Sequence, residues 1–199
     1  MNKILAINGS YRDDGITDQT VEAMARALSS DGVEVEVILL REYSIEFCLN
    51  CRECTQQAGD IPGKCVQHDG MEELVNKIEQ ADGFILASPT NLGSVTAIFK
   101  RFMERLTVYG YWPWNKNYPQ LRKANVQKKK AVIISSCAAP GFIGRLMYGA
   151  HKQLKMTAQI IGAETVGTLF TGSISKEPHP RLTEAVQKKI KTLAVKLLK

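Results

Sequence analysis

Apolar and polar positions along the chain alternate in blocks that predict strands and helices in turn. Residues 4–8 form a short apolar run that is typical of a buried strand. A polar stretch follows, and then Val21, Met24 and Leu28 recur at the spacing of one helical face. Because strand, loop and helix repeat in this order, we expect an α/β protein with a parallel sheet covered on both faces.

The pattern predicts five strands and five helices in one domain spanning residues 1–199. A chain of this length with 44% hydrophobic residues is suited to a single core. Asp69 is the expected N-cap of the second helix, with Glu72 completing a capping box. The fourth helix is expected to end near Ile161, and the last to begin near Pro180. The expected strands are 4–8, 33–40, 84–87, 131–135 and 163–170.

Two long segments interrupt this alternation. Residues 41–68 form a loop that carries four of the five cysteines, and residues 108–127 form an insertion rich in tyrosine and tryptophan. Large aromatic side chains supply contact area at interfaces and in apolar pockets. The insertion is therefore interpreted as a lid, as a wall contributed by a second subunit, or as a hydrophobic cluster beneath a long loop.

Three small polar loops follow the carboxyl ends of apolar strands, at residues 9–17, 88–94 and 135–141. Ligands bind beside these strand ends in an open parallel sheet, so we expect the loops to meet at one site. The first loop leads into a helix, where unpaired N–H groups and the helix dipole favour a phosphate. It has neither the P-loop pattern nor the Gly-x-Gly-x-x-Gly pattern, which excludes both of those nucleotide sites.

Composition limits the partners and the compartment. Much of the net charge of +6 comes from lysines at 128–130 and in the last helix, where we expect a solvated face. No aromatic residues alternate with these lysines, so no nucleic-acid surface is predicted. No apolar run approaches the roughly 20 residues of a membrane span, and the first residues lack a signal-peptide core. We therefore expect a cytoplasmic protein whose clustered cysteines bind a metal or remain thiols.

Several motifs occur together in the first half of the chain and cover residues 3 to about 107. They are Gly9-Ser10-x-Arg12-x-x-Gly15-x-Thr17, Cys48-x-x-Cys51-x-x-Cys54, Lys64-Cys65-x-x-x-Asp69-x-Met71, Ala81-Asp82-Gly83 and Ser88-Pro89-Thr90-Asn91-Leu92-Gly93-Ser94-Val95. Jointly they resemble the flavodoxin-like NAD(P)H-dependent FMN reductases, and most closely the iron–sulfur flavoprotein branch. The resemblance implies a flavodoxin-like three-layer sandwich with a five-stranded parallel sheet in the order 2-1-3-4-5.

The resemblance also implies a non-covalently bound FMN. Its phosphate would be bound by Ser10, Arg12, Gly15, Ile16, Thr17 and Asp18. Its ring and ribityl chain would be bordered by Pro89, Thr90, Asn91, Leu92, Gly93 and Ser94 on one side, and by Ser136, Cys137, Ala138 and Gly141 on the other. The chain departs from the family pattern at Tyr11 and Ile16, so Ile16 would contact the phosphate only through its backbone.

The implied activity is the transfer of electrons from NADH or NADPH through FMN by a ping-pong mechanism, with no catalytic acid or base. The acceptor would be a quinone, an azo or nitro compound, oxygen or a protein partner. A homodimer or homotetramer is expected. The alternatives are a non-enzymatic electron carrier, flavodoxin-like or of the iron–sulfur kind, and a sensing module built on residues 48–68.

The cysteine spacing leaves three interpretations open. Cys48, Cys51, Cys54 and Cys65 resemble the ligand set of a [4Fe–4S] cluster, although ten residues separate the last two, more than is usual in that branch. Cys51, Cys54, Cys65 and His68 have the spacing of a structural zinc site. The third interpretation is that these cysteines bind no metal. Cys137 is expected to be a small residue beside the flavin.

Overall fold

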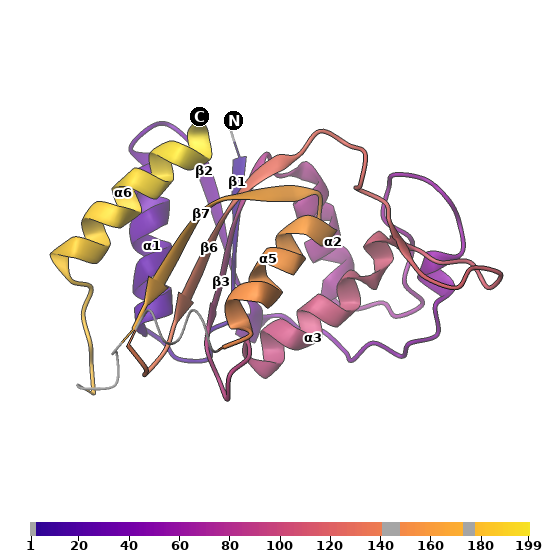
Figure 1. Cartoon of the computed structure of the whole chain (residues 1–199), viewed down its shortest axis with the longest axis horizontal. Coiled ribbons are helices and arrows are strands. Elements are labelled where there is room, and N and C mark those ends of the chain that lie inside the picture. Colours follow the sequence, from indigo (N-terminus) through magenta and orange to yellow (C-terminus); the bar gives the residue numbers. More distant parts are fainter. Residues whose placement is uncertain (1–2, 141–147, 173–177) are drawn as a thin grey trace.

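A computed structural model describes residues 3–140, 148–172 and 178–199. Its main sheet is parallel and has the strand order β2-β1-β3-β6-β7 (Figure 1). This is the predicted flavodoxin-like order, because the two short strands β4 and β5 lie outside the sheet. The five strands are β1 (Lys3–Asn8), β2 (Glu34–Leu39), β3 (Gly83–Pro89), β6 (Lys129–Ser136) and β7 (Ala163–Thr171).

Helices cover both faces of the sheet (Figure 1). On one face lie α1 (Ile16–Ser29) and α6 (Glu184–Leu198), and on the other α2 (Gly70–Gln80), α3 (Ala97–Arg105) and α5 (Ala150–Ile160). Apolar side chains alternate between two cores along each central strand. In β1, for example, Leu5 and Ile7 belong to the core beneath α2 and α3, whereas Ile4 and Ala6 belong to the core beneath α1 and α6.

Local capping decides where several elements begin. The last helix starts at Glu184 rather than near Pro180, since the hydroxyl of Thr183 accepts a hydrogen bond from the N–H of Val186. Asp69 is the predicted N-cap of α2 and accepts from the N–H of Met71 at 3.0 Å. The side chain of Glu72 lies 3.8 Å from His68, so among the described contacts the reciprocal half of the capping box is not formed.

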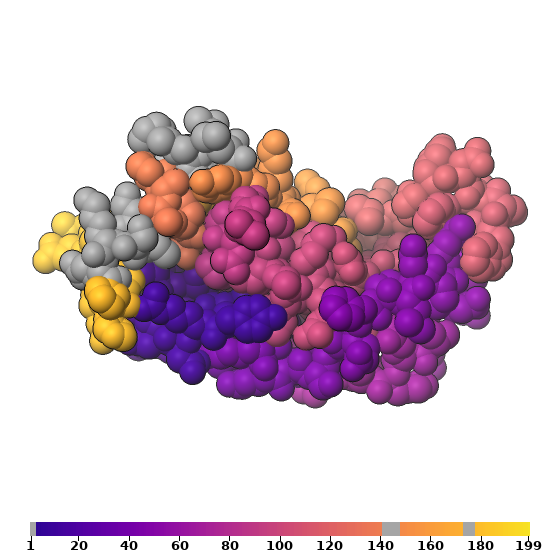
Figure 2. Space-filling view, turned by 90° about the horizontal axis from the view of Figure 1, so that it is seen from below, coloured from indigo at the N-terminus to yellow at the C-terminus, as the bar shows by residue number. Residues whose placement is uncertain are grey.

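The cysteine loop and the aromatic insertion pack against each other beyond the sheet. The insertion contains a short antiparallel pair, β4 (Gly110–Tyr111) and β5 (Gln120–Leu121), which was not among the predicted strands. The N–H of Trp112 donates to the carbonyl of Thr55 at 2.9 Å, and the N–H of Gly63 donates to that of Val108 at 2.8 Å. We call residues 41–68 and 108–127 together the lobe, which extends from one end of the molecule (Figure 2).

No helix in the described parts of the chain combines the length and apolarity that a membrane crossing requires. The lysines at 128–130 are not all free in solvent, in contrast to the expectation. Lys129 is partly buried, and its Nζ donates to the carbonyls of Ile78 and Glu79 at 3.3 and 2.9 Å. These carbonyls belong to the last turn of α2, where a cation also interacts favourably with the helix dipole.

Candidate functional site

The three polar loops meet at the carboxyl edge of the sheet, as the sequence predicted. The N–H of Gly9 donates to the carbonyl of Ala87 at 2.8 Å, and the hydroxyl of Thr96 donates to the carbonyl of Gly9 at 2.6 Å. The N–H of Thr90 donates to the carbonyl of Ser136 at 2.7 Å. Viewed onto this edge, the loops lie next to one another across the centre and left of Figure 2. Hydrogen bonds therefore join all three loops into one surface.

The first loop places a helix start and several hydroxyl groups together. Gly15 is the N-cap of α1 and has no side chain to satisfy the first N–H groups of the helix. Thr17, in the first turn, is buried with its hydroxyl 2.9 Å from that of Ser136. The hydroxyl of Ser10 donates to the carbonyl of Arg12 at 3.2 Å. Ile16 is buried and can offer only its backbone N–H. Together, the N–H groups at the start of α1 and the nearby hydroxyls are donors suited to a phosphate.

Gly9 explains how closely the first loop approaches α3. A Cβ atom at this position would lie 2.7 Å from Cβ of Phe99 and 2.8 Å from its Cδ2. Any larger residue would push the loop away from the helix. The glycine therefore permits the close contact between the first loop and α3.

A buried polar network beneath this loop was not predicted from the sequence. Asp18 is buried and accepts from Nδ2 of Asn8 at 2.7 Å. Its other carboxylate oxygen lies 3.2 Å from Nη2 of Arg41, whose Nη1 donates to the carbonyl of Ser10 at 3.0 Å. Arg41 thus holds the first loop in position by bonding both Ser10 and Asp18. No motif in the sequence marked it, since it follows β2 and reaches the loop only in the folded chain.

Arg12 lies at the exposed rim of the site. Its Nη2 donates to the carbonyl of Pro178. The side chain of Gln19 donates to the carbonyls of Asp14 and Pro180 at 2.7 and 3.0 Å. The segment that precedes α6 is therefore tied to the first loop, and Arg12 must exchange a carbonyl partner before it can bind a phosphate.

The second loop is a tight turn that approaches the site with its backbone. Asn91 and Ser94 form two reciprocal N–H to carbonyl hydrogen bonds of 2.8 and 2.9 Å. Between them, Leu92 and Gly93 have φ angles of 45° and 79°. This left-handed pair is typical of a type I′ turn, and the side chain of Leu92 is fully exposed. Pro89 and Thr90 lie at the base of the turn, beside Ser136.

The third loop contributes small buried groups. Ser136 and Cys137 are buried, and the thiol of Cys137 donates to the carbonyl of Ala139 at 3.2 Å. Burial raises the pKa of this thiol, which suits a packing residue and not a nucleophile. Ala138 is exposed at the edge. Gly141, the remaining residue predicted for this loop, lies outside the described residues.

The four clustered cysteines lie in the lobe as free, partly exposed thiols. The thiols of Cys48, Cys51 and Cys65 all act on that of Cys54. Burial, followed by the charges of Cys65, Cys48 and Cys51, raises the pKa of Cys54 to about 11. The other three thiols therefore each lie near enough to Cys54 to affect its pKa. Four cysteine thiols in one loop are the donor set of an iron–sulfur cluster, so the residues present fit that group.

Two arginines hold the cysteine loop in shape. Arg122 donates from three nitrogens to the carbonyls of Val108, Gly59 and Cys54 at 3.1, 3.1 and 3.2 Å. The guanidinium of Arg52, between two cysteines, lies 3.6 Å from the ring centre of Trp112 and 4.6 Å from that of Trp114. The aromatic insertion therefore supports the cysteine loop directly. No sequence motif indicated this role, which arises from contacts between distant segments.

The structure does not favour the zinc interpretation. The imidazole of His68 is exposed, and its Nδ1 lies near Glu72. Within the described ranges, no group of three or more His, Cys, Asp or Glu side chains is placed to hold a single metal ion. That observation concerns single ions, and the [4Fe–4S] assignment of the four cysteines stays a prediction.

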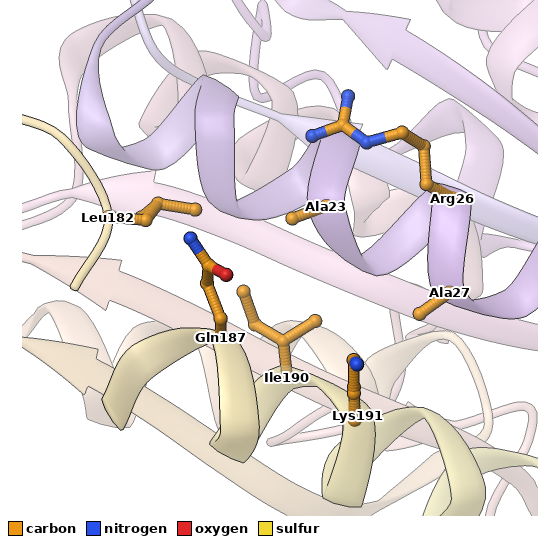
Figure 3. Close-up of a pocket in the computed structure, with 7 residues that line it drawn as sticks. All are labelled: Ala23, Arg26, Ala27, Leu182, Gln187, Ile190 and Lys191. Atoms are coloured by element: carbon orange, nitrogen blue, oxygen red, sulfur yellow. The ribbon is translucent and has the colours of Figure 1, made fainter. Parts of the chain in front are cut away.

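Two cavities lie away from the carboxyl edge. One of about 470 Å³ separates residues 61–68 from α2 and is lined by Cys65, Met71, Val75, Glu79 and Arg105, among others. Another of about 340 Å³ lies between α1 and α6 (Figure 3). Ala23, Ala27 and Ile190 form its apolar walls. None of the predicted flavin-binding residues lines either cavity.

Comparison with known proteins agrees with this arrangement. The family model for the NADPH-dependent FMN reductases matches residues 2–170. Among curated proteins, an iron–sulfur flavoprotein of Archaeoglobus fulgidus is 36% identical over 111 residues, which is 56% of this chain and 48% of that protein. An iron–sulfur flavoprotein of Methanocaldococcus jannaschii is 35% identical over 103 residues, or 52% of this chain and 51% of that protein. Each match thus covers about half the length of the relative.

Solved structures show the same fold at low sequence identity. An FMN-dependent NADH-azoreductase from Bacillus anthracis, in complex with FMN, has a TM-score of 0.71 and 12% identity, with full coverage of both chains. An NADH:FMN oxidoreductase has a TM-score of 0.63 and 18% identity, covering 99% of this chain and 88% of that one. At such identities the likeness establishes the fold alone.

Proposed function

Because the chain belongs to the NADPH-dependent FMN reductase family, we propose that it is an oxidoreductase that carries electrons from NADH or NADPH through FMN to a second acceptor. The single observation that carries the proposal is the junction of three loops at the carboxyl edge of the sheet. Its hydrogen bonds bring a helix start, three buried hydroxyl groups and a glycine turn to one surface.

The phosphate of FMN would lie at the start of α1. There the N–H groups after Gly15 and the hydroxyls of Ser10, Thr17 and Ser136 supply donors, and the helix dipole favours the negative charge. Arg41 keeps the loop in place from below and is itself held by Asp18. Arg12 at the rim adds a cation.

The ring of FMN would lie between the turn at 89–94 and the loop at 136–138. Gly93 allows the backbone of that turn to approach a flat group closely. When bound, FMN supplies the hydride chemistry, and the protein supplies orientation and electrostatics. The acceptor would be a quinone, an azo or nitro compound, oxygen or a protein. Since no side chain at the edge is required as an acid or base, we assign none as catalytic.

The experiment that tests this function is steady-state kinetics on FMN-loaded protein, with NADH or NADPH as donor and a soluble quinone as acceptor. We expect parallel lines in double-reciprocal plots, because the donor product leaves before the acceptor binds. Intersecting lines would contradict the ping-pong order. Failure of either nicotinamide to reduce the bound flavin under anaerobic conditions would contradict the donor assignment.

A second candidate function is supported by the cysteine loop. We propose that Cys48, Cys51, Cys54 and Cys65 ligate a [4Fe–4S] cluster, which would make the protein a one-electron carrier as well as a two-electron acceptor. The gathered thiols and the names of the two archaeal relatives support this. Iron and acid-labile sulfide assays on anaerobically purified protein test it, with four of each per chain expected and none in the contradictory case.

The free thiols also bear on location. Thiols persist in reducing compartments, so we propose a cytoplasmic protein, without contact to membranes or nucleic acids. The apolar side chains exposed on the lobe support assembly into a homodimer or a larger homo-oligomer.

A further inference from the structure

Arg105 is a buried cation that contacts the cysteine loop directly. Its side chain is 1% exposed, and its Nη2 lies 3.5 Å from Sγ of Cys65, at hydrogen-bonding distance for a sulfur acceptor. A guanidinium carries its charge at every accessible pH and offers donors only. One of the four clustered thiols therefore has a permanent positive donor beside it.

The position of this guanidinium is fixed by other partners. Its two terminal nitrogens donate to the two carboxylate oxygens of Asp69 at 2.6 and 3.1 Å, a bidentate geometry. Nη1 also donates to the carbonyl of Glu46 at 2.9 Å. Burial opposes ionisation of Asp69, but hydrogen bonds from Arg105 and two backbone N–H groups hold its pKa below the usual range. The nitrogen directed at Cys65 thus cannot move without breaking a buried ion pair.

Arg105 also ends the helix that starts at the flavin loops. Thr96, the N-cap of α3, is bonded to the carbonyl of Gly9 in the first loop, and Arg105 is the last residue of the same helix. The nine residues of α3 are about 13.5 Å long at the rise of an α-helix. A short rigid element therefore connects the proposed flavin site with Cys65.

We propose that Arg105 is a positioning residue for the iron–sulfur site: it orients the sulfur of Cys65 and raises the reduction potential of the cluster. This inference rests on the proposed cluster. The potential of an iron–sulfur centre depends on hydrogen bonds to its sulfurs and on nearby charge. A positive donor at a ligating sulfur stabilises the more negative, reduced form more than the oxidised form. Removing the donor must then lower the potential.

The test is a redox titration followed by EPR on protein loaded with FMN and the cluster, comparing wild type with Arg105→Lys. Lysine keeps the charge for Asp69, but its single nitrogen cannot hold Asp69 and Cys65 in the same geometry. We expect the ratio of reduced to oxidised cluster at a fixed potential to fall about tenfold, or about 59 mV for a one-electron couple. The matched control is Lys100→Gln, which removes an exposed charge from the same helix and should leave the potential unchanged.

A second variant covers the case in which Arg105→Lys fails to fold. The double variant Asp69→Asn, Arg105→Gln removes both charges, so no unpaired carboxylate remains buried. Its potential should be lower than that of wild type at unchanged FMN content, because the two lost charges offset each other and the loss of the donor to Cys65 remains. An unchanged potential in a folded, cluster-loaded variant overturns the role of Arg105 and leaves the cluster standing. Wild-type protein that takes up no iron and sulfide on anaerobic reconstitution overturns both.

Discussion

At the scale of single residues, the proposed phosphate site depends on hydroxyl groups beside the start of α1. Thr17 and Ser136 are buried, yet in the described contacts their hydroxyls have mainly each other as partners. Such a pair can turn toward an anion at little cost, because both groups already lie beside the helix start. The phosphate is therefore expected to contribute much of the affinity for FMN.

Replacement of Thr17 by valine tests this residue. Valine keeps the shape and removes one donor, and a hydrogen bond to a charged group contributes about 1.5–3 kcal/mol. The dissociation constant for FMN should rise about tenfold or more, as measured by quenching of flavin fluorescence.

Two controls accompany this measurement. Riboflavin, which lacks the phosphate, should bind wild type and Thr17→Val alike. Thr20→Val removes a buried hydroxyl one turn further along the same helix, where it donates to the carbonyl of Ile16, and should not change FMN affinity. An equal loss of riboflavin affinity in Thr17→Val would show that the substitution distorts the loop.

The meeting of the three loops at one edge was predictable from the sequence, because each loop follows a strand end and is rich in glycine, hydroxyl or proline residues. Arg41, Arg105 and Arg122 were not. Each is a charged residue in a region where the sequence suggests a solvated side chain. Arg105 and Arg122 are buried, and Arg41 is partly buried, because distant segments supply their carboxylate or carbonyl partners. Hydrogen bonds and ion pairs with partners far away in the chain leave no pattern in the local sequence.

At the scale of elements, two segments of the cysteine loop come into backbone contact where Gly63 meets Cys54. A Cβ atom there would lie 1.8 Å from the carbonyl oxygen of Cys54. The backbone must shift to admit any side chain, so this contact holds Cys65 near the other cysteines.

We therefore predict that Gly63→Ala loses its bound iron and sulfide while FMN affinity stays within about twofold of wild type, since overpacking costs about 1–3 kcal/mol and falls on the lobe alone. Iron assay and flavin titration check this. The control is Gln57→Ala, an exposed position in the same loop. Full iron content in Gly63→Ala would show that the loop tolerates the displacement.

A second element-scale contact joins β2 to α2 and β1. Glu36 in β2 pairs with Lys77 of α2 and lies 3.1 Å from Lys3 of β1. The hydrogen bond from Lys77 is the main reason why the pKa of Glu36 lies below 4.5, although partial burial opposes it. Its contribution to stability is therefore complete above the unfolded pKa and is lost as pH falls through the lower folded value.

Glu36→Gln should accordingly be less stable than wild type at pH 7, by up to about 1 kcal/mol, with the difference shrinking as pH decreases below 4.5. Urea unfolding at a series of pH values measures it. Glu34→Gln, at a more exposed position 3.7 Å from Lys3, should show a smaller effect. A difference that does not vary with pH would rule out an ionic origin.

The sequence predicted the elements well wherever buried strands and capped helices coincided. It differs from the structure at element boundaries, and it did not predict the two short strands of the insertion. The last helix begins only after Thr183, whose hydroxyl caps it. The pairing of β4 with β5 depends on the packing of the insertion against the cysteine loop. Two-residue strands carry too few side chains for a period to be visible.

At the scale of the whole molecule, the lobe exposes apolar side chains that the rest of the fold does not cover. Phe47, Leu49, Ile61, Trp114 and Tyr118 are each more than half exposed. Exposed apolar side chains that form a contiguous patch usually mark an interface. It lies apart from the α1 and α6 face, where the lysines of α6 are exposed.

We predict that wild type is a dimer or larger in solution and that Leu49→Asp combined with Tyr118→Asp shifts it toward monomer, without a change in the far-ultraviolet spectrum. Light scattering after size exclusion measures the mass. Val195→Asp, at an exposed apolar position on α6, should leave the assembly intact. A monomeric wild type would mean that these side chains serve another partner.

The most direct test of the account is a titration of flavin-free protein with FMN and, separately, with riboflavin. We expect saturation at one FMN per chain, with riboflavin bound at least about tenfold more weakly because the phosphate donors at α1 remain unused. Absence of FMN binding, or equal affinity for the two flavins, would contradict a phosphate seat at the carboxyl edge and the function built on it.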